Sequence, residues 1–549
     1  MSRLKNFIKT NTIKWGGLIL LISLVFILDK RYFTSPPLRS DDWNWIIYPN
    51  IFEPLQIINF VDRRPFFAWL LTVLSSILGL NIQWYYVVNW LLLFFSGLVF
   101  YLIIKYAFPE QAWLALPSAL IYMIYPVNYA RTWLIIINNT YALLLALCAI
   151  LLMVLYAQSG NTVRLILGNA LFLISLGTYE AGFGLVMLSA FLLIVFKHHL
   201  EKRTRILLAS FLLTGIGFLL WRAFIQPHFT TLQDDYLLSL NLTSSTIIDR
   251  YIQGAFIFLN NWLGPLLFWT GEFRFWIFVG IGVLLIFTIL VMLPGWIKSA
   301  KANSEFLYKD RKLQAKSLAA IFAVGVFCWA AGYIPVIFLW QPIFFGDGSR
   351  VNFSSIPGAA IALAAGIAGL ITFFVHRKEQ VKRILHIAII PLLLLGLAYQ
   401  LHSQNQRVQI WETKKAFWQS MFEVVPGLED GTKVIIVIPG YDELGPFEML
   451  PFRGDWEAES ALRVLYHNQS LFSEYYYPDA PDYGDNWVPT VADLSRYLFV
   501  FYDPVQVSVR IIEDPERALA LPVSTSGYDP AQRLTAYQTE MGSYRFLVD

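Results

Sequence analysis

Residues 84–105 have the sequence WYYVVNWLLLFFSGLVFYLIIK, in which Lys105 is the single charged side chain. A helix needs about 20 mostly apolar residues to cross the hydrocarbon core of a bilayer, so this run predicts a transmembrane helix. The whole chain shares its character, since 57% of the 549 residues are hydrophobic and 14% are charged. An ordinary soluble domain has about 25% charged residues. The composition indicates an integral membrane protein and excludes a soluble enzyme, a disordered chain and a collagen-like chain.

Charge divides the chain into a basic and an acidic part. Residues 1–401 carry 30 basic and 16 acidic side chains, whereas residues 402–549 carry 11 basic and 22 acidic ones. Basic residues gather in the short loops 197–205, 298–316 and 376–383. Because cytoplasmic loops carry an excess of Lys and Arg, we expect these loops and the N-terminus to face the cytoplasm. The chain is predicted to be a multi-pass protein of the plasma membrane whose acidic C-terminal part is extracytoplasmic.

Apolar runs predict about 11 transmembrane helices in the domain formed by residues 1–401. Two cytoplasmic loops must be separated by an even number of spans, and this parity excludes two of the runs. Residues 66–80 are too short, so we expect an interfacial helix within the first external loop, 29–83. Residues 252–270 are interrupted by paired asparagines and a Gly-Pro step, which indicates an external interfacial or re-entrant segment. The predicted spans are 15–28, 84–105, 112–127, 140–157, 165–178, 180–196, 206–224, 273–293, 317–340, 354–375 and 384–401.

Residues 402–549 have the pattern of a soluble extracytoplasmic α/β domain. Residues 433–438 form a short apolar run typical of a buried strand, and residues 505–511 alternate with the period of a strand. Residues 456–475 have a helical pattern. The stretch 475–487 is rich in Tyr and Asp, which suits an exposed loop or a loop that contacts an acceptor sugar.

Acidic residues are rare in the membrane part, so each one is a candidate for function. Asp41 and Asp42 follow the first predicted span, and Glu180 lies in the turn between two short predicted spans. An ionisable group recessed in a membrane costs on the order of 2.5–3.5 kcal/mol unless it is paired or hydrated. The three acids are therefore candidate catalytic residues. The alternative for each is a structural role in capping a helix.

Further landmarks follow the acidic pair along the chain. They are Arg64-Pro65-Phe66, the segments 77–81 and 108–112, Tyr125-Pro126, and the late segment Gly348-Ser349-Arg350-Val351-Asn352 followed by Pro357. Over about residues 1–375, this order resembles the GT-C membrane glycosyltransferases, a superfamily that includes protein O-mannosyltransferases and the aminoarabinose transferases acting on lipid A. The chain departs from that pattern at Asn138-Asn139, where members often carry Asp, and at Tyr179-Glu180, where several carry Lys.

The resemblance implies transfer of a sugar from a polyprenyl-phosphate donor to a glycan, lipid or protein acceptor at the outer membrane face, with inversion at the anomeric carbon. Asp41 would be the general base, with Asp42 and Glu180 assisting it. A guanidinium would hold the leaving phosphate because its planar fork matches phosphate oxygens. The candidates are Arg350, Arg64, Arg63 and Arg131 for the phosphate, and Tyr179, Asn138, Asn139 and Trp43 for acceptor contacts or support of the site.

Other functions and ligands stay open on the sequence alone. Asp41, Asp42 and Glu180 could supply oxygen ligands to a divalent metal such as Mg²⁺ or Mn²⁺; no other cofactor is predicted. A transporter or flippase of lipid-linked glycans is one alternative function, and a polysaccharide polymerase or ligase is another. Nucleic-acid binding is not expected, because the basic residues lie in short loops that orient the protein.

Overall fold

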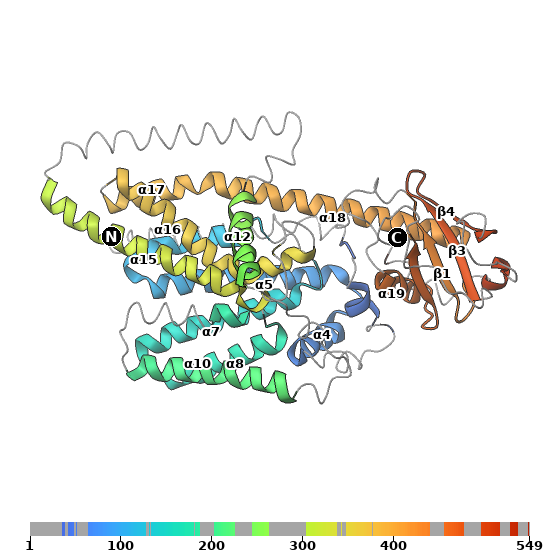
Figure 1. Ribbon diagram of the computed structural model, residues 1–549, viewed down its shortest axis with the longest axis horizontal. Coiled ribbons are helices and arrows are strands. Elements are labelled where there is room, and N and C mark those ends of the chain that lie inside the picture. Colours follow the sequence, from blue (N-terminus) through green and yellow to red (C-terminus); the bar gives the residue numbers. More distant parts are fainter. Residues whose placement is uncertain are drawn as a thin grey trace, which may run out of the picture.

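The computed structural model consists of a helical bundle joined to a small α/β domain (Figure 1). Asp41, Arg63 and the predicted spans 15–28 and 273–293 lie outside the residues that it describes. The described residues are 36–38, 42–48, 51, 64–127, 131, 133–180, 182–186, 202–225, 244–262, 304–337, 342, 347–375, 377–439, 455–476, 496–515, 528–535 and 547.

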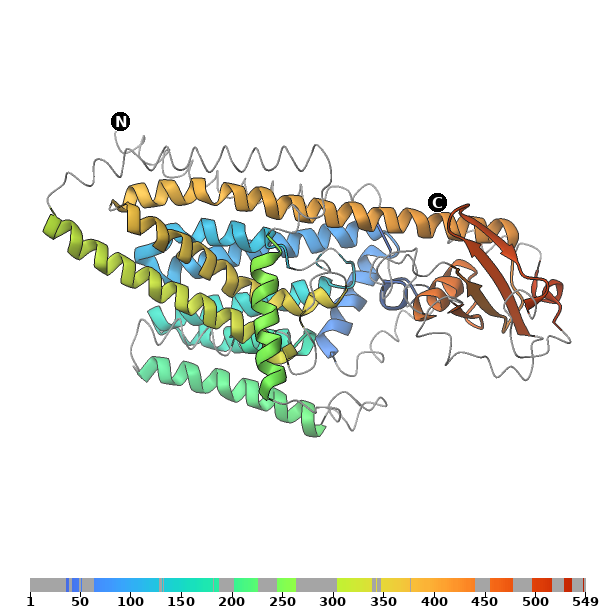
Figure 2. The same cartoon turned by 45° about the horizontal axis from the view of Figure 1, so that its top comes forward.

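Most helices of the bundle run along its long axis, as both views show (Figures 1 and 2). The described elements of the bundle, in chain order, are η1 (Trp43–Ile47), α4 (Pro65–Leu78), α5 (Ile82–Ala107), η2 (Pro109–Leu114), α6 (Ala115–Ile124), α7 (Ile137–Ser159), α8 (Thr162–Thr178), α10 (Lys202–Leu220), η4 (Trp221–Ile225), α12 (Ser244–Asn260), α15 (Ser304–Ile337), η6 (Asp347–Ser355), α16 (Ile356–Phe374), α17 (Lys378–Ala388) and α18 (Ile390–Val424).

Within the described part of the chain, six helical segments are long and apolar enough to cross a membrane, which agrees with an integral membrane protein. These six segments do not confirm the prediction of about 11 spans. Two further apolar helices, Pro65–Leu78 and Thr162–Thr178, are shorter; the first lies where an interfacial helix is predicted. The six segments are Ile82–Ala107, Ile137–Ser159, Lys202–Ile225, Leu313–Pro335, Ser349–Phe374 and Lys378–Val424.

The predicted span 112–127 differs most clearly from the structure. It contains the end of η2 and the ten-residue helix α6, which is about 15 Å long and so covers only half of a bilayer core. Helix α6 ends because Tyr125 precedes Pro126 and adopts an extended ψ of 124°. Nearly every residue of α6 is buried. The apolar run therefore fills the interior of the bundle instead of facing lipid.

Helix α15 packs closely against α16 and η6 through glycines. A Cβ atom on Gly325 would collide with the backbone nitrogen of Ala362 in α16, and one on Gly332 would collide with the carbonyl oxygen of Ser354 in η6. Small residues that allow such approach are typical of helix pairs in membranes.

Helix α12 crosses the other helices at a steep angle (Figures 1 and 2). It covers the first part of the segment 252–270, for which an external interfacial or re-entrant position is predicted, and begins eight residues earlier, at Ser244. Its inner side contacts α15, where Arg250 donates a hydrogen bond to the carbonyl oxygen of Ile337 at 2.5 Å.

The α/β domain contains a four-stranded sheet in the order β2-β1-β3-β4. Strand β1 (Lys433–Val437) is parallel to β2 (Phe472–Tyr476) and to β3 (Tyr497–Asp503), and β4 (Ser508–Ile511) is antiparallel to β3. Helix α19 (Asp455–Leu465) lies between β1 and β2 in the chain. The 3₁₀ helix η10 (Pro530–Arg533) follows the sheet.

The alternation of side chains in the strands separates the two faces of the sheet. Val434 and Ile436 belong to one buried cluster with residues of α18 and α19, whereas Ile435 and Phe499 form a second cluster with Tyr528. Both helices therefore cover the same face. Because both faces of β1 are covered, its residues from Val434 to Val437 are apolar without interruption.

Two predicted boundaries in this domain are wrong. The helix predicted over 456–475 ends at Leu465, because a turn with His467 at a left-handed φ of 49° precedes β2. The strand predicted over 505–511 begins only at Ser508, because Val507 has a φ of 52° within a turn. Strand β1 matches its prediction, whereas neither β2 nor β3 was predicted.

Helix α18 connects the two parts without a break (Figure 1). It crosses the predicted domain boundary after Leu401 and continues to Val424. One buried cluster contains Trp43 of η1, Leu71 of α4, Trp411 of α18 and Leu462 of α19. The end of the bundle and the α/β domain thus share one apolar core.

Candidate functional site

Four polar side chains meet where α4, α8 and η4 come together. Arg64 precedes α4, Tyr179 and Glu180 follow α8, and Arg222 lies in η4. Nε of Arg64 lies 3.5 Å from Oε2 of Glu180, and Nη1 of Arg222 lies 2.9 Å from Oε1 of the same carboxylate. The Arg64 guanidinium also lies 4.5 Å from the centroid of the Tyr179 ring. We call these four residues the arginine cluster.

The local sequence fixes Arg64 at this place. Pro65 is the first residue of α4, a position where its missing N–H and preset φ are favourable. Arg64, which precedes this proline, has an extended φ of −141°. Helix α4 approaches α8 at Gly177, where a Cβ atom would lie only 2.5 Å from Cδ2 of Phe66. Glycine at 177 therefore allows the start of α4 to lie beside the end of α8.

Glu180 lies in a tight turn after α8. Tyr179 is extended, with φ −162° and ψ 120°, and its N–H still donates to the carbonyl oxygen of Ser175 at 2.9 Å. The carbonyl oxygen of Glu180 accepts the N–H of Phe183 at 2.9 Å, which begins the next helical turn. Glu180 thus turns away from α8 and reaches both arginines.

Charge and exposure make the arginine cluster able to bind an anion. Burial alone would raise the pKa of the Glu180 carboxyl, but the Arg64 and Arg222 guanidiniums outweigh burial and hold this pKa below its usual 4.5. Two cations and one anion leave a net charge of about +1. The three charged side chains remain 28–34% exposed. A guanidinium carries five N–H donors, so donors remain for an oxyanion such as phosphate.

Asp42 occupies a different environment, buried beside η1. Its side chain is 1% exposed, and Oδ1 accepts the N–H of Ile135 at 2.9 Å. It lines a cavity of about 10 Å³ with Arg407, Trp133 and Trp411, which is near the volume that a single water molecule needs. Because its oxygen accepts this backbone N–H, Asp42 ties the start of η1 to the residues that precede α7.

Trp43 is fully buried in the shared core, with its ring centroid 6.4 Å from that of Trp411. Asn138 and Asn139 are also buried, in the first turn of α7, where Asn138 Oδ1 accepts the N–H of Asn139 at 2.6 Å. Arg131 is 5% exposed and donates to the carbonyl oxygen of Met123 in the last turn of α6. The structure thus places these four residues in the interior.

Arg350 is half-buried in η6. Its neighbour Asn352 is fully buried, accepts the hydroxyl of Tyr333 at 2.6 Å and donates to the carbonyl oxygen of Val127 at 2.9 Å. These bonds anchor η6 to α15 and to the end of α6. The ion pairs of the arginine cluster do not include Arg350.

Two arginines at these sites were not predicted. Arg222 is the one charged residue in the apolar stretch 206–224, and that isolation is the signal that could have identified it. Arg407 is 3% exposed and its guanidinium lies 5.2 Å from the centroid of the Trp133 ring. The residues around Arg407 are polar, so the sequence does not indicate that this arginine is buried.

Asp42 and Glu180, the predicted metal ligands that the structure describes, do not form a site that suits a divalent metal. The described residues contain no group of three or more His, Cys, Asp or Glu side chains that could hold a metal ion. The Glu180 carboxylate already has two guanidiniums beside it, and these would repel a cation. The third predicted ligand, Asp41, lies outside the described residues.

A scan against protein-family models finds no match to this chain, and a search of curated proteins finds none with significant similarity.

Proposed function

We propose that the protein is an inverting glycosyltransferase that uses a polyprenyl-phosphate sugar at the outer face of the membrane. The observation that carries the proposal is the arginine cluster, in which one carboxylate orients two partly exposed guanidiniums. A lipid-linked donor places its phosphate at the membrane interface, where it must meet a fixed cation. Arginine remains charged there and presents a bidentate fork to phosphate oxygens.

In this proposal Arg64 and Arg222 bind the donor phosphate and stabilise the negative charge that develops on it as the sugar leaves. Glu180 holds both guanidiniums in place. Its lowered pKa makes it a weak proton acceptor, so its role is to position the arginines. Tyr179 supports Arg64 through its ring.

The acceptor hydroxyl must lose a proton as its oxygen attacks the anomeric carbon and the bond to phosphate oxygen breaks. We assign this proton to Asp41, which immediately precedes Asp42 in the sequence. A single displacement of this kind inverts the anomeric configuration. Asp42, which is bonded to the Ile135 N–H, has the supporting role of anchoring η1.

The test is transfer by the full-length protein in liposomes, supplied with a panel of defined polyprenyl-phosphate hexoses and with membrane-derived acceptors. Release of polyprenyl phosphate and the anomeric configuration of the product are measured. Asp41→Asn keeps the shape of the side chain but removes its basicity, so transfer should fall about 10²–10⁴-fold.

Asp42→Asn is the matched control, because its Oδ1 can still accept the Ile135 N–H, and it should lose much less. Full transfer by both variants would exclude the acid-pair mechanism. Movement of intact donor across the bilayer without transfer would favour the flippase alternative instead.

A further inference from the structure

Helix α17 lies at the end of the bundle away from the α/β domain, and α18 continues from it (Figures 1 and 2). Exposed side chains of the two helices form one face. Ile389 joins them in a helical conformation, with φ −80° and ψ −17°. Its N–H donates to the carbonyl oxygen of Leu385 at 3.0 Å, and its own carbonyl oxygen accepts the N–H of Leu393 at 2.9 Å. The helical spacing of side chains therefore continues across the junction.

This face changes from charged to apolar along its length. Glu379, Arg383, His386, Ile390 and Leu394 follow one another at helical spacing and are all exposed. The first three are polar, and the last two are apolar. With a rise of 1.5 Å per residue, Arg383 and Leu394 are roughly 16 Å apart along the axis. A phospholipid has the same order, with a charged head group followed by acyl chains.

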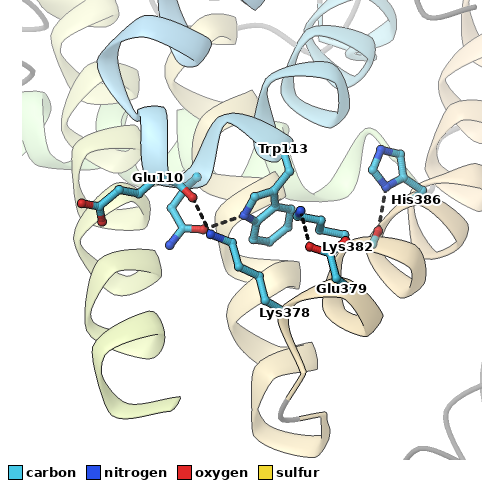
Figure 3. A network of polar contacts seen from close by, with 7 residues as sticks. Glu110, Trp113, Lys378, Glu379, Lys382 and His386 are labelled. Carbon is cyan, nitrogen blue, oxygen red and sulfur yellow. Dashed lines mark hydrogen bonds and ion pairs between the residues drawn. The ribbon is translucent and has the colours of Figure 1, made fainter. Parts of the chain in front are cut away.

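The opposite side of α17 fixes the orientation of the face. Val381, Ile384 and Leu385 are buried in the apolar core of the bundle. Lys378 donates to the carbonyl oxygen of Glu110 in η2 at 2.7 Å, which holds the start of α17 (Figure 3). The face that carries Arg383 consequently cannot rotate into the protein.

Most polar groups of α17 have partners. Lys382 is paired with Glu379 at 2.7 Å, and Nδ1 of His386 donates to the carbonyl oxygen of Lys382 at 2.6 Å (Figure 3). The exposed guanidinium of Arg383 makes no hydrogen bond or ion pair with another described residue. Its fork is available to an external phosphate.

The surroundings favour an anionic lipid. Arg377 to Arg383 include four basic residues and one acidic residue, and basic clusters next to a transmembrane helix attract anionic head groups. The last turn of α16 exposes Leu370 and Phe373 by 65% and 70%. Apolar and aromatic side chains at this level are typical of the membrane interface.

We propose that this face binds an anionic phospholipid. Arg383 holds its phosphate within the positive field of Arg377, Lys378 and Lys382, and an acyl chain lies along Ile390 and Leu394. The site lies at the other end of the bundle from the arginine cluster and does not depend on the proposed transfer reaction.

The test uses the full-length protein in detergent, titrated with phosphatidylglycerol or phosphatidylcholine that carry identical acyl chains. Bound lipid is counted by native mass spectrometry. The wild-type protein should bind phosphatidylglycerol more tightly, and the preference should fall as salt rises. Arg383→Gln should weaken phosphatidylglycerol binding about fivefold, the usual effect of one basic residue.

Three further arms separate this site from general effects. Arg510→Gln removes the same charge from the exposed strand β4 and should leave the lipid preference unchanged. Replacing Ile390 and Leu394 by Gln should weaken both lipids, and glycerol phosphate should not compete, because it has no acyl chain. Equal binding of the two lipids by the wild type, or unchanged binding by a folded Arg383→Gln protein, would overturn the proposal.

Discussion

Neighbouring charges decide the role of the Glu180 carboxylate. The carboxylate is held by Arg64 and Arg222, and its pKa is lowered although burial alone would raise it. A carboxyl with a lowered pKa stabilises the folded state above its usual pKa, and that contribution is lost as the pH falls through the lowered value. Glu180 should thus remain ionised from pH 5 to 8.

This gives a pH prediction for the proposed reaction. Glu180→Gln should reduce kcat/KM, because the arginines lose the group that orients them, but the variant should keep the shape of the wild-type pH profile between pH 5 and 8. The measurement is kcat/KM for the lipid donor across that interval. Loss of the acidic limb in Glu180→Gln would identify Glu180 as the base and contradict its positioning role.

The contact between α4 and α8 brings Arg64 to Glu180 in the arginine cluster. A Cβ atom at Gly177 would lie 2.5 Å from Phe66, so Gly177→Val should push α4 away and separate Arg64 from Glu180. Overpacking of this kind costs about 1–3 kcal/mol. We expect a lower unfolding temperature and weaker donor use in Gly177→Val.

The partner substitution distinguishes this contact from general damage to α8. Phe66→Ala removes the ring that Gly177→Val would strike, so the double variant should recover much of the lost donor use. Gly168 of the same helix provides a comparison, since a Cβ there would meet Phe211 of α10 instead. If Phe66→Ala rescued Gly168→Val as well as Gly177→Val, the specific contact would not be the cause.

A buried ion pair ties α18, the helix that leaves the bundle, to the α/β domain. Lys414 of α18 is paired with Glu457 of α19, and they are 1% and 2% exposed. Glu457→Gln would leave a buried ammonium without its counter-charge, which costs about 3–5 kcal/mol. Because the two parts share a core, both should lose stability together in thermal unfolding.

Glu459→Gln is the matched control on the same helix. Glu459 is paired with Arg463 at 2.7 Å with a 31% exposed side chain, and such surface pairs contribute about 0–1 kcal/mol. Replacing Lys414 by Met and Glu457 by Leu together should restore most of the stability lost in Glu457→Gln. Equal unfolding temperatures for Glu457→Gln and Glu459→Gln would show that the pair does not couple the two parts.

The sequence predicted those features that depend on local pattern. The length of the apolar run in Ile82–Ala107 indicates a long apolar helix, and the short apolar run of β1 indicates a buried strand. Helix α6 was predicted as a span because its composition is apolar, and composition does not distinguish burial in protein from burial in lipid. The turn at His467 was missed because nothing in its sequence marks a left-handed residue.

The candidate site was predictable in part, for a physical reason. Arg64, Tyr179 and Glu180 stood out as polar residues beside apolar runs, and the structure brings them together. Arg222 is marked in the sequence only by its isolation in an apolar stretch, and its pairing with Glu180 depends on how α8 and η4 pack, which the local sequence does not encode. The same holds for Asp42 and Arg407, which line one cavity although they are far apart in the chain.

The proposed function requires the arginine cluster to hold the donor phosphate. The most direct measurement is the affinity of the full-length protein for a sugar-free polyprenyl phosphate, compared among the wild type, Arg222→Gln, Arg222→Lys and Arg350→Gln. Loss of a charge-assisted contact of about 1.5–3 kcal/mol predicts roughly 10- to 100-fold weaker binding for Arg222→Gln, partial recovery with Lys, and little change for Arg350→Gln. Wild-type affinity in a folded Arg222→Gln protein, together with a loss in Arg350→Gln, would place the phosphate at η6 and exclude the arginine cluster as its site.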